Sequence, residues 1–132
     1  MPWSISIRTG SRTEMTDVTS EVQREVEKRG LNQGVCTVYV PHTTAGITIN
    51  EGADPAVCED IIGKLNELVP RSRDYRHMEG NADSHIKASL TGGSVSVIVE
   101  NGRLVLGTWQ RIFFCEFDGP RSRKAYVQLT GV

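Results

Sequence analysis

The sequence predicts an α+β domain with a largely antiparallel sheet, on three observations. Short strand-like runs recur along most of the chain, while helical periodicity is confined to two or three segments. Asn101-Gly102 lies between two apolar runs, and this dipeptide is typical of a two-residue hairpin turn. The strands do not alternate regularly with helices, as they do in parallel βαβ units. We therefore expect seven or eight strands and two or three helices in one domain covering residues 1–132.

Strands and one helix are predicted in the N-terminal part. Apolar and polar residues alternate over 3–8, as in a half-buried strand, and β-rich runs follow at 35–40 and 47–49 on either side of a polar turn. A helix is predicted where three valines recur every fourth residue: Val18, Val22 and Val26. Asp17 can cap this helix, and Gly30 can end it.

Two further helices are predicted in the middle of the chain. Asp54-Pro55 combines a carboxylate at the N-cap with proline at the first helical position, and Pro70 ends the helix. Its buried stripe is expected to consist of Val57, Ile61, Leu65 and Leu68. After the charged, irregular segment 71–82, a short helix is expected over 83–90. The remaining strands are predicted at 95–99, 104–109, 112–117 and 125–129, with a turn at 118–121.

Composition excludes several classes of function. The net charge of the 132 residues is −1, so the chain has no general basic field for nucleic acid. No apolar stretch approaches the roughly 20 residues that a membrane helix needs. The N-terminal residues lack the apolar core of a signal peptide, so we expect a cytoplasmic protein. The three cysteines are widely spaced among apolar neighbours and are expected to be packing residues: Cys36, Cys58 and Cys115.

The chain has three histidines, His42, His77 and His85, and all of them lie in polar, turn-rich segments. Neutral imidazole is a common ligand of Zn²⁺, and three histidines plus water is a pattern of open catalytic zinc sites. The spacing does not decide the matter, because His77 and His85 are eight residues apart rather than the four of a helical zinc motif. Ordinary surface histidines are the alternative.

Acidic, amide and basic residues occur in the same segments. Asn50 and Glu51 end the strand after the His42 turn, while Glu79, Asn81 and Asp83 flank the other two histidines. Asp54 and Asp83 have helix capping as their alternative role. A carboxylate such as Glu116 in an apolar strand is costly to bury unpaired, so it should face water, a cation or a metal site. Gln110 shares this ambiguity, and Arg121, in a turn fixed by Gly119-Pro120, is the basic residue most suited to bind an anion.

These segments resemble the YjbQ-like family, also described as the secondary thiamine-phosphate synthase family, over nearly the whole chain. The segments that carry the resemblance are 41–51 (PHTTAGITINE), 53–55 (ADP), 79–90 (EGNADSHIKASL), 102–104 (GRL), 106–110 (LGTWQ) and 116–121 (EFDGPR). Two positions depart from the family pattern. Ser84 stands where alanine is common, and Arg111 stands where glycine often follows Trp-Gln.

The resemblance implies a two-sheet, mostly antiparallel β-sandwich with two or three helices, assembled as a homotrimer around a threefold axis. It implies a divalent metal, zinc or alternatively magnesium for pyrophosphate chemistry, with His42, His77 and His85 as ligands. The residues expected to bind a cofactor or ligand beside the metal are Thr43, Thr44, Asn50, Asn81 and Gln110. The activity implied is a weak condensation of a thiazole phosphate with a pyrimidine pyrophosphate.

Three functions stay open at this stage. In a metal-dependent enzyme acting on phosphorylated small molecules, Glu51 or Glu116 would be the general base and Arg121 would hold an anion. In a binding module, the same residues would capture a small anionic metabolite without catalysis. In a structural protein, they would build a subunit interface or a closed metal site with a fourth protein ligand.

Overall fold

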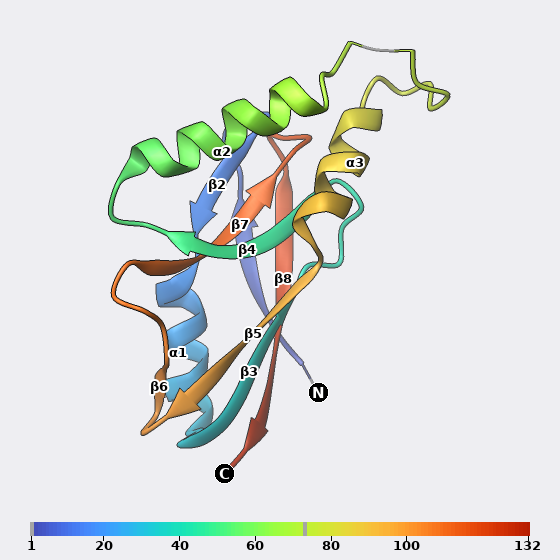
Figure 1. The fold of residues 1–132 in the computed structure, drawn as a ribbon. Coiled ribbons are helices and arrows are strands. Elements are labelled where there is room, and N and C mark those ends of the chain that lie inside the picture. Colours follow the sequence, from blue (N-terminus) through green and yellow to red (C-terminus); the bar gives the residue numbers. More distant parts are fainter. Residues whose placement is uncertain (1, 73) are drawn as a thin grey trace.

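The computed structural model describes residues 2–72 and 74–132 (Figure 1). Within these residues the chain forms three helices and eight strands, which confirms the predicted α+β class. In chain order the elements are β1 (Trp3–Arg8), β2 (Glu14–Asp17), α1 (Thr19–Arg29), β3 (Gln33–Tyr39), β4 (Ala45–Glu51), α2 (Pro55–Leu68), α3 (Ala82–Thr91), β5 (Ser94–Glu100), β6 (Arg103–Leu104), β7 (Gln110–Glu116) and β8 (Ser122–Gly131). None of the helices in the described part of the chain is long and apolar enough to cross a membrane.

The described strands form two antiparallel sheets. The larger has the order β1-β8-β3-β5-β6, and the smaller has the order β2-β7-β4. The first and last strands are neighbours, with Trp3 opposite Val127 and Arg8 opposite Ser122. In the smaller sheet, β7 is central, and its residue Glu116 lies opposite Ala45 of β4 and Glu14 of β2. The end of β7 therefore lies beside the start of β4 and the start of β2.

The main core lies between the two sheets and is closed at one end by α1. It takes inward residues from both sheets, among them Val38 of β3 and Phe114 of β7, together with Val22 and Val26 of α1. The predicted end of α1 is confirmed, because Gly30 is its C-cap with a left-handed φ of 69°. The predicted start is one residue off: Val18 is the N-cap residue and has no side-chain cap, while Asp17 precedes it and accepts a hydrogen bond from the Thr19 amide at 2.9 Å.

The strand β7 is buried on both faces, which explains its uninterrupted apolar run. Ile112 and Phe114 belong to the core between the sheets, whereas Phe113, Cys115 and Phe117 pack on the other side beneath α2 and α3. Figure 1 shows α2 lying across this outer side of the smaller sheet. The molecule therefore has three layers: the larger sheet, the smaller sheet, and the pair of helices.

The cysteines have the packing environment predicted for them. Cys36 and Cys115 are buried, and Cys58 is half-buried in α2. Burial raises the pKa of the Cys36 thiol to about 11. Burial, with a smaller effect of the neighbouring Cys58, raises the pKa of the Cys115 thiol to about 12. These thiols are neutral at physiological pH, so neither is an activated nucleophile.

Three predicted details of the fold are wrong or incomplete. The stripe of α2 is not a buried one: Leu68 is 63% exposed, and the other stripe residues are half-buried, because α2 lies at the surface on only a three-stranded sheet. The edge strand β2 was not predicted, because only one of its four residues is apolar. The run 104–109 is a strand only as far as Leu104, since the amide of Gly107 turns to the Gln110 side chain at 2.8 Å.

The hairpin turn itself is confirmed. Asn101 has a φ of 53° and Gly102 a φ of 76°, so both central residues are in the left-handed region. This is the conformation of a type I′ turn, whose twist matches that of the flanking strands. Of the residue types, asparagine and glycine enter this region at the lowest cost.

The burial pattern predicts different costs for two truncations. Ile112→Ala removes a side chain that is 0% exposed, so we expect a loss of about 2–5 kcal/mol in the free energy of unfolding. Leu68→Ala should cost less than about 0.5 kcal/mol, because its side chain is largely in water. Urea unfolding of both variants measures this. A large cost at Leu68 would mean that the end of α2 is covered in solution.

Candidate functional site

A polar pocket of about 370 Å³ lies where the β3–β4 connection, the start of α3 and the β7–β8 turn meet. We call it the histidine pocket, and its lining residues are Pro41, His42, Thr43, Thr44, Glu79, Asn81, His85, Asp118, Arg121 and Arg123. Six of the eleven residues predicted for the site line this pocket: His42, Thr43, Thr44, Asn81, His85 and Arg121. They come from segments far apart in the sequence, and Figure 1 shows the β3–β4 connection beside α3.

A buried ion pair forms the base of the histidine pocket. Glu116 is 0% exposed and Arg123 is 8% exposed. The guanidinium of Arg123 donates two hydrogen bonds to the Glu116 carboxylate, one of them from Nε to Oε1 at 2.8 Å. Arg123 also donates to the Thr44 hydroxyl at 2.8 Å, which fixes the β3–β4 connection over the end of β7. Removing either charge would leave the other buried and unpaired, which is costly.

Glu116 is held as a carboxylate by several donors. The hydroxyl of Thr9 donates to its Oε1 at 2.8 Å, and the amide of Asp118 donates to its Oε2 at 3.0 Å. Burial acts to raise the pKa of Glu116, but the hydrogen bonds from Arg123, Asp118 and Thr9 outweigh it, so the pKa lies below its ordinary value. Of the three alternatives considered for this side chain, the structure has it facing a cation.

The β7–β8 turn fits tightly over Glu116. A Cβ atom on Gly119 would lie 2.3 Å from the Ser11 carbonyl oxygen and 2.8 Å from Cγ of Glu116, so only glycine fits there. The turn directs Arg121 into the pocket wall, where its Nε donates to the Asp118 carbonyl at 2.8 Å and its Nη2 to the Asp118 carboxylate at 2.9 Å. Burial acts to raise the pKa of Asp118, but the hydrogen bonds from Asn81 and Arg121 and the charges of Arg121 and Arg12 outweigh it. The pKa therefore lies below its ordinary value, and this side chain too is a carboxylate.

A chain of alternating charges runs from the pocket wall to α3. Arg12 lies 3.0 Å from Asp118 and 3.0 Å from Asp83, and Asp83 lies 2.9 Å from the Lys87 ammonium. Asp83 and Lys87 are both buried. Capping, the alternative role considered for Asp83, is therefore not what the structure shows: Asn81 is the N-cap residue, and Asp83 lies inside the first turn as the centre of two ion pairs.

His42 is turned toward the backbone of β8. Its Nε2 lies 3.1 Å from both the amide nitrogen and the carbonyl oxygen of Lys124. Burial, followed by the positive charge of Arg123, lowers the pKa of His42 below its ordinary value. The imidazole is therefore neutral at pH 7, and within the described residues its Nδ1 forms no hydrogen bond.

The other two histidines lie together. The ring centroids of His77 and His85 are 5.0 Å apart in an edge-to-face arrangement, and His77 Nε2 lies 3.9 Å from a Glu79 oxygen. Over residues 2–72 and 74–132, no three histidine, cysteine, aspartate or glutamate side chains are placed to hold a metal ion. The described residues of one chain as arranged here therefore do not by themselves form the three-histidine metal site that the family resemblance implies.

Within one chain, three predicted site residues lie away from the histidine pocket. Asn50 pairs with Arg111, and Glu51 pairs with Gln110, at the opposite end of β4 and β7 from Ala45 and Glu116. The strand β4 is continuous from Ala45 to Glu51, and six residues at about 3.3 Å each carry Glu51 roughly 20 Å away. Proximity in sequence to the His42 turn therefore does not place Asn50 and Glu51 at the histidine pocket of the same chain.

Asn81 has an unusual hydrogen-bonding state. Its Nδ2 donates to the Asp118 carboxylate at 2.8 Å, and this fixes the orientation of the amide because a carboxylate only accepts. In the described part of the chain, its buried Oδ1 has no hydrogen-bond partner. An unsatisfied buried acceptor costs on the order of 1–3 kcal/mol, which a donor from water or a ligand would remove.

Arg123, the residue that fixes the base of the pocket, was not predicted; of the basic residues around the β7–β8 turn, only Arg121 was. The signal was available, because Arg123 is in period-two register with Ala125 and Val127, whose side chains face the core. Arg12, Asp118 and Lys87 were missed for lack of such a signal, since their partners are distant in the sequence.

Comparison with known proteins identifies the class. The family model described as "UPF0047 protein YjbQ-like" matches residues 3–132. UPF0047 protein YugU of Bacillus subtilis is 51% identical over 129 residues, covering 97% of this chain and 98% of that protein. A UPF0047 protein of Methanocaldococcus jannaschii is 48% identical over 131 residues, covering 99% of this chain and 95% of its own length.

Solved structures agree with this fold. An uncharacterised yjbQ/UPF0047 protein from Clostridium acetobutylicum is 49% identical with a TM-score of 0.95, covering 97% of this chain and 99% of that one. A YbjQ-like protein of unknown function from Sulfolobus solfataricus is 37% identical, also with a TM-score of 0.95, covering 100% of this chain and 97% of that one. The chain belongs to the YjbQ-like UPF0047 family.

The buried pair predicts a large stability effect at Glu116. Glu116→Gln removes the charge that neutralises Arg123, and we expect a loss of about 3–5 kcal/mol in the free energy of unfolding. The matched control is Asp17→Asn, in the exposed pair with Arg111, which should cost less than about 1 kcal/mol. Chemical denaturation at pH 7 measures both. Equal, small losses would show that Arg123 finds other partners.

The same variant also changes the dependence of stability on pH. Because the pKa of Glu116 is lower in the folded protein, the unfolded chain takes up the proton first as pH falls below the ordinary value of 4.5. The contribution of Glu116 to the free energy of unfolding is therefore complete above pH 4.5. It is lost as the pH falls through the pKa that Glu116 has in the folded protein. Glu116→Gln should remove this part of the acid-induced loss, leaving a shallower slope below pH 4.5.

Proposed function

We propose that the histidine pocket binds a small phosphorylated molecule. The observation that carries this proposal is the convergence of Arg121, His42 and His85 on one polar pocket whose base is fixed by a buried ion pair. In the described residues the Nη1 of Arg121 makes no hydrogen bond, although Nε and Nη2 are held by Asp118. Asp118 thus fixes the orientation of the guanidinium through Nε and Nη2, and Nη1 is left to donate to an anion.

The other lining groups suit the same kind of ligand. The hydroxyl of exposed Thr43 can donate to a phosphate oxygen or accept from a hydroxyl group. His42, neutral at pH 7, can accept a proton or donate one through its ring nitrogens. Glu116 is buried and fully engaged with Arg123, so we propose that it positions the pocket rather than acting as the general base.

The reaction implied by the family resemblance is a candidate for this pocket. A thiazole phosphate and a pyrimidine pyrophosphate both carry the anionic group that Arg121 would hold, so we propose thiamine-phosphate synthesis as a weak activity to be tested first. Glu51 lies about 20 Å along β4 and contributes nothing to this pocket. Capture of a phosphorylated metabolite without turnover is the second candidate, favoured by the engagement of Glu116 in its ion pair.

We propose that a divalent metal ion binds to the histidine pocket only together with the phosphorylated molecule. Since three protein donors do not converge among the described residues, a zinc ion held by the protein alone does not fit this arrangement. Mg²⁺ is usually held by one or two carboxylates plus substrate phosphates, and Glu79 is the exposed carboxylate that lines the pocket. The proposed binding of the phosphorylated molecule does not depend on the metal.

Binding of inorganic pyrophosphate tests the proposed function. We expect it to shift the backbone amide resonances of Thr43, Thr44, Asn81 and His85 in the ¹⁵N-labelled protein. Arg121→Ala should weaken this binding by about tenfold or more, because a charge-assisted hydrogen bond is lost. Arg103→Ala, which removes an arginine outside this pocket, should change the affinity at these amides by less than about twofold.

The result that would refute the proposal is the absence of shifts at these four amides at millimolar pyrophosphate. Repeating the titration with Mg²⁺ and with a chelator tests the proposed metal. If Mg²⁺ binds together with pyrophosphate, the affinity for pyrophosphate should be higher with Mg²⁺ than with the chelator. Turnover assays with the two thiamine precursors separate catalysis from capture. Metal analysis of the purified protein tests zinc directly, and a stoichiometric zinc content would require the histidines to rearrange.

We also propose that the protein is a homotrimer, with the outer face of the larger sheet as its subunit interface. This face carries exposed apolar side chains on the neighbouring strands β3 and β5, with Val35 at 40%, Tyr39 at 52% and Ile98 at 64% exposure. Apolar side chains gathered on one sheet face are typical of an association surface. The threefold symmetry is what the family resemblance implies.

Sedimentation equilibrium tests the assembly. The wild-type protein should have three times the mass of the chain, and Ile98→Lys should shift it toward the monomer, because a charge is costly to bury in an apolar interface. Leu68→Lys, at an equally exposed position on α2, is the matched control and should leave the mass unchanged. A wild-type monomer would disprove the trimer.

A further inference from the structure

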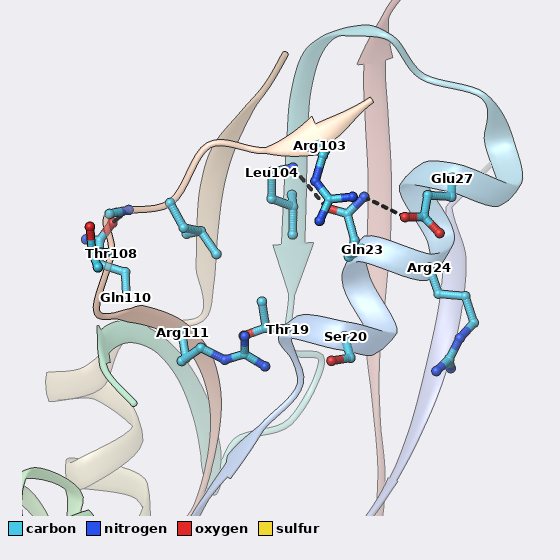
Figure 2. A pocket seen from close by; sticks show the side chains of 12 residues that line it. Thr19, Ser20, Gln23, Arg24, Glu27, Arg103, Leu104, Thr108, Gln110 and Arg111 are labelled. Atoms are coloured by element: carbon cyan, nitrogen blue, oxygen red, sulfur yellow. Dashed lines mark hydrogen bonds between the residues drawn. The ribbon is translucent and has the colours of Figure 1, made fainter. Parts of the chain in front are cut away.

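A second pocket, of about 590 Å³, lies between α1 and the segment that follows the β5–β6 hairpin (Figure 2). We call it the arginine pocket, because Arg24, Arg103 and Arg111 all line it. Glu27 is the one carboxylate among its described lining residues, so the balance of charge is positive. It shares no lining residue with the histidine pocket. Its volume lies within the range of small-molecule sites, roughly 300–1,000 Å³.

Arg111 is held in a defined position at one side of this pocket. Its Nε donates to the Asp17 carboxylate at 2.7 Å, and Asp17 is itself fixed by the Thr19 amide at 2.9 Å. The stem of Arg111 lies on Gly52, where an added Cβ would come within 2.1 Å of Cγ of Arg111. Figure 2 shows the guanidinium extending toward the start of α1. Within the described chain its terminal nitrogens have no hydrogen-bond partner.

Arg103 enters the pocket from the opposite side, out of the short strand β6 (Figure 2). In residues 2–72 and 74–132 its guanidinium has no ion-pair partner. Its backbone is nevertheless anchored, because the Gln23 side chain accepts from the Leu104 amide at 2.9 Å and donates to the Gly102 carbonyl at 2.9 Å. One glutamine of α1 thus holds the hairpin that carries Arg103 at a fixed distance from the helix.

The remaining wall supplies neutral polar groups. Gln110 closes the turn at the start of β7, where its side chain accepts from the Gly107 amide at 2.8 Å, and Thr108 and Ser20 are exposed hydroxyls. Arg24 lies along the outer side of α1 with its guanidinium turned away from the other two arginines in Figure 2, so it belongs to the rim. The Glu27 carboxylate, held by Gln23 at 3.3 Å, can accept from hydroxyl groups.

We propose that the arginine pocket binds a second phosphorylated small molecule, one that carries hydroxyl groups, such as a sugar phosphate. Arg103, whose guanidinium has no ion-pair partner in the described residues, would hold the phosphate in a bidentate geometry, and Arg111 on the opposite side would donate to the other end of the ligand. Hydroxyl groups of the ligand would meet Ser20, Thr108 and Glu27. This site is independent of the proposed function of the histidine pocket, because the two share no residue.

Titration of the ¹⁵N-labelled protein with ribose 5-phosphate tests the proposal. We expect shifts at the amides of Leu104 and Gly107, which report on the two ends of the pocket wall. Arg103→Ala should weaken the affinity read at these amides by about tenfold or more. Arg111→Gln should weaken it similarly, and Arg121→Ala, in the histidine pocket, should leave it within about twofold.

Each outcome decides between the two pockets. Ribose and inorganic phosphate, titrated separately, show whether both parts of the ligand are recognised, and both should bind more weakly than ribose 5-phosphate. Arg103→Ala should retain the wild-type unfolding temperature, because that side chain has no ion pair to lose, so it decides the question even if Arg111→Gln fails to fold. Shifts confined to the amides of Thr44 and His85, or undiminished binding in Arg103→Ala, would overturn this proposal while leaving the first one intact.

Discussion

The buried pair between Glu116 and Arg123 is the interaction on which the rest of the structure depends. It joins the two sheets, because Glu116 ends a strand of the smaller sheet and Arg123 begins a strand of the larger one. A buried ion pair is not in itself evidence of net stabilisation, since apolar residues of equal volume often do as well or better. They do fix one arrangement of Thr44, the β7–β8 turn and Thr9, and this arrangement is what gives the histidine pocket its shape.

Local signals in the sequence were sufficient for much of the fold. The helix α1, its Asp17 contact and its Gly30 end, and the Asn101-Gly102 turn follow from the side chains of a few adjacent residues. The exposure of α2 could not be obtained in this way, because its apolar stripe looks like that of any surface helix. How deeply such a stripe is buried depends on the width of the sheet beneath it, which only the complete topology determines.

The candidate site was predictable to the extent that its residues lie in turns. The segments around His42, His85 and Arg121 are polar and irregular, and the fold does bring them together. Asn50 and Glu51 were grouped with them because of their place in the sequence, but the continuous strand β4 carries both residues to the other end of the sheet. Arg123 was not predicted, because a charged residue is not expected on the inward-facing side of a strand such as β8.

The pairing of β1 with β8 has a consequence for the order of folding. β8 lies between β1 and β3, so the larger sheet has a gap in its middle until the chain has been synthesised almost to Gly131. A nascent chain that ends before β8 also has Glu116 without its cation and the facing edges of β1 and β3 without their backbone hydrogen-bond partners. Such contacts between distant parts of a chain form slowly. The larger sheet should therefore close only once β8 has been synthesised, and a ribosome-bound chain that lacks β8 should depend on chaperones that cover exposed strand edges.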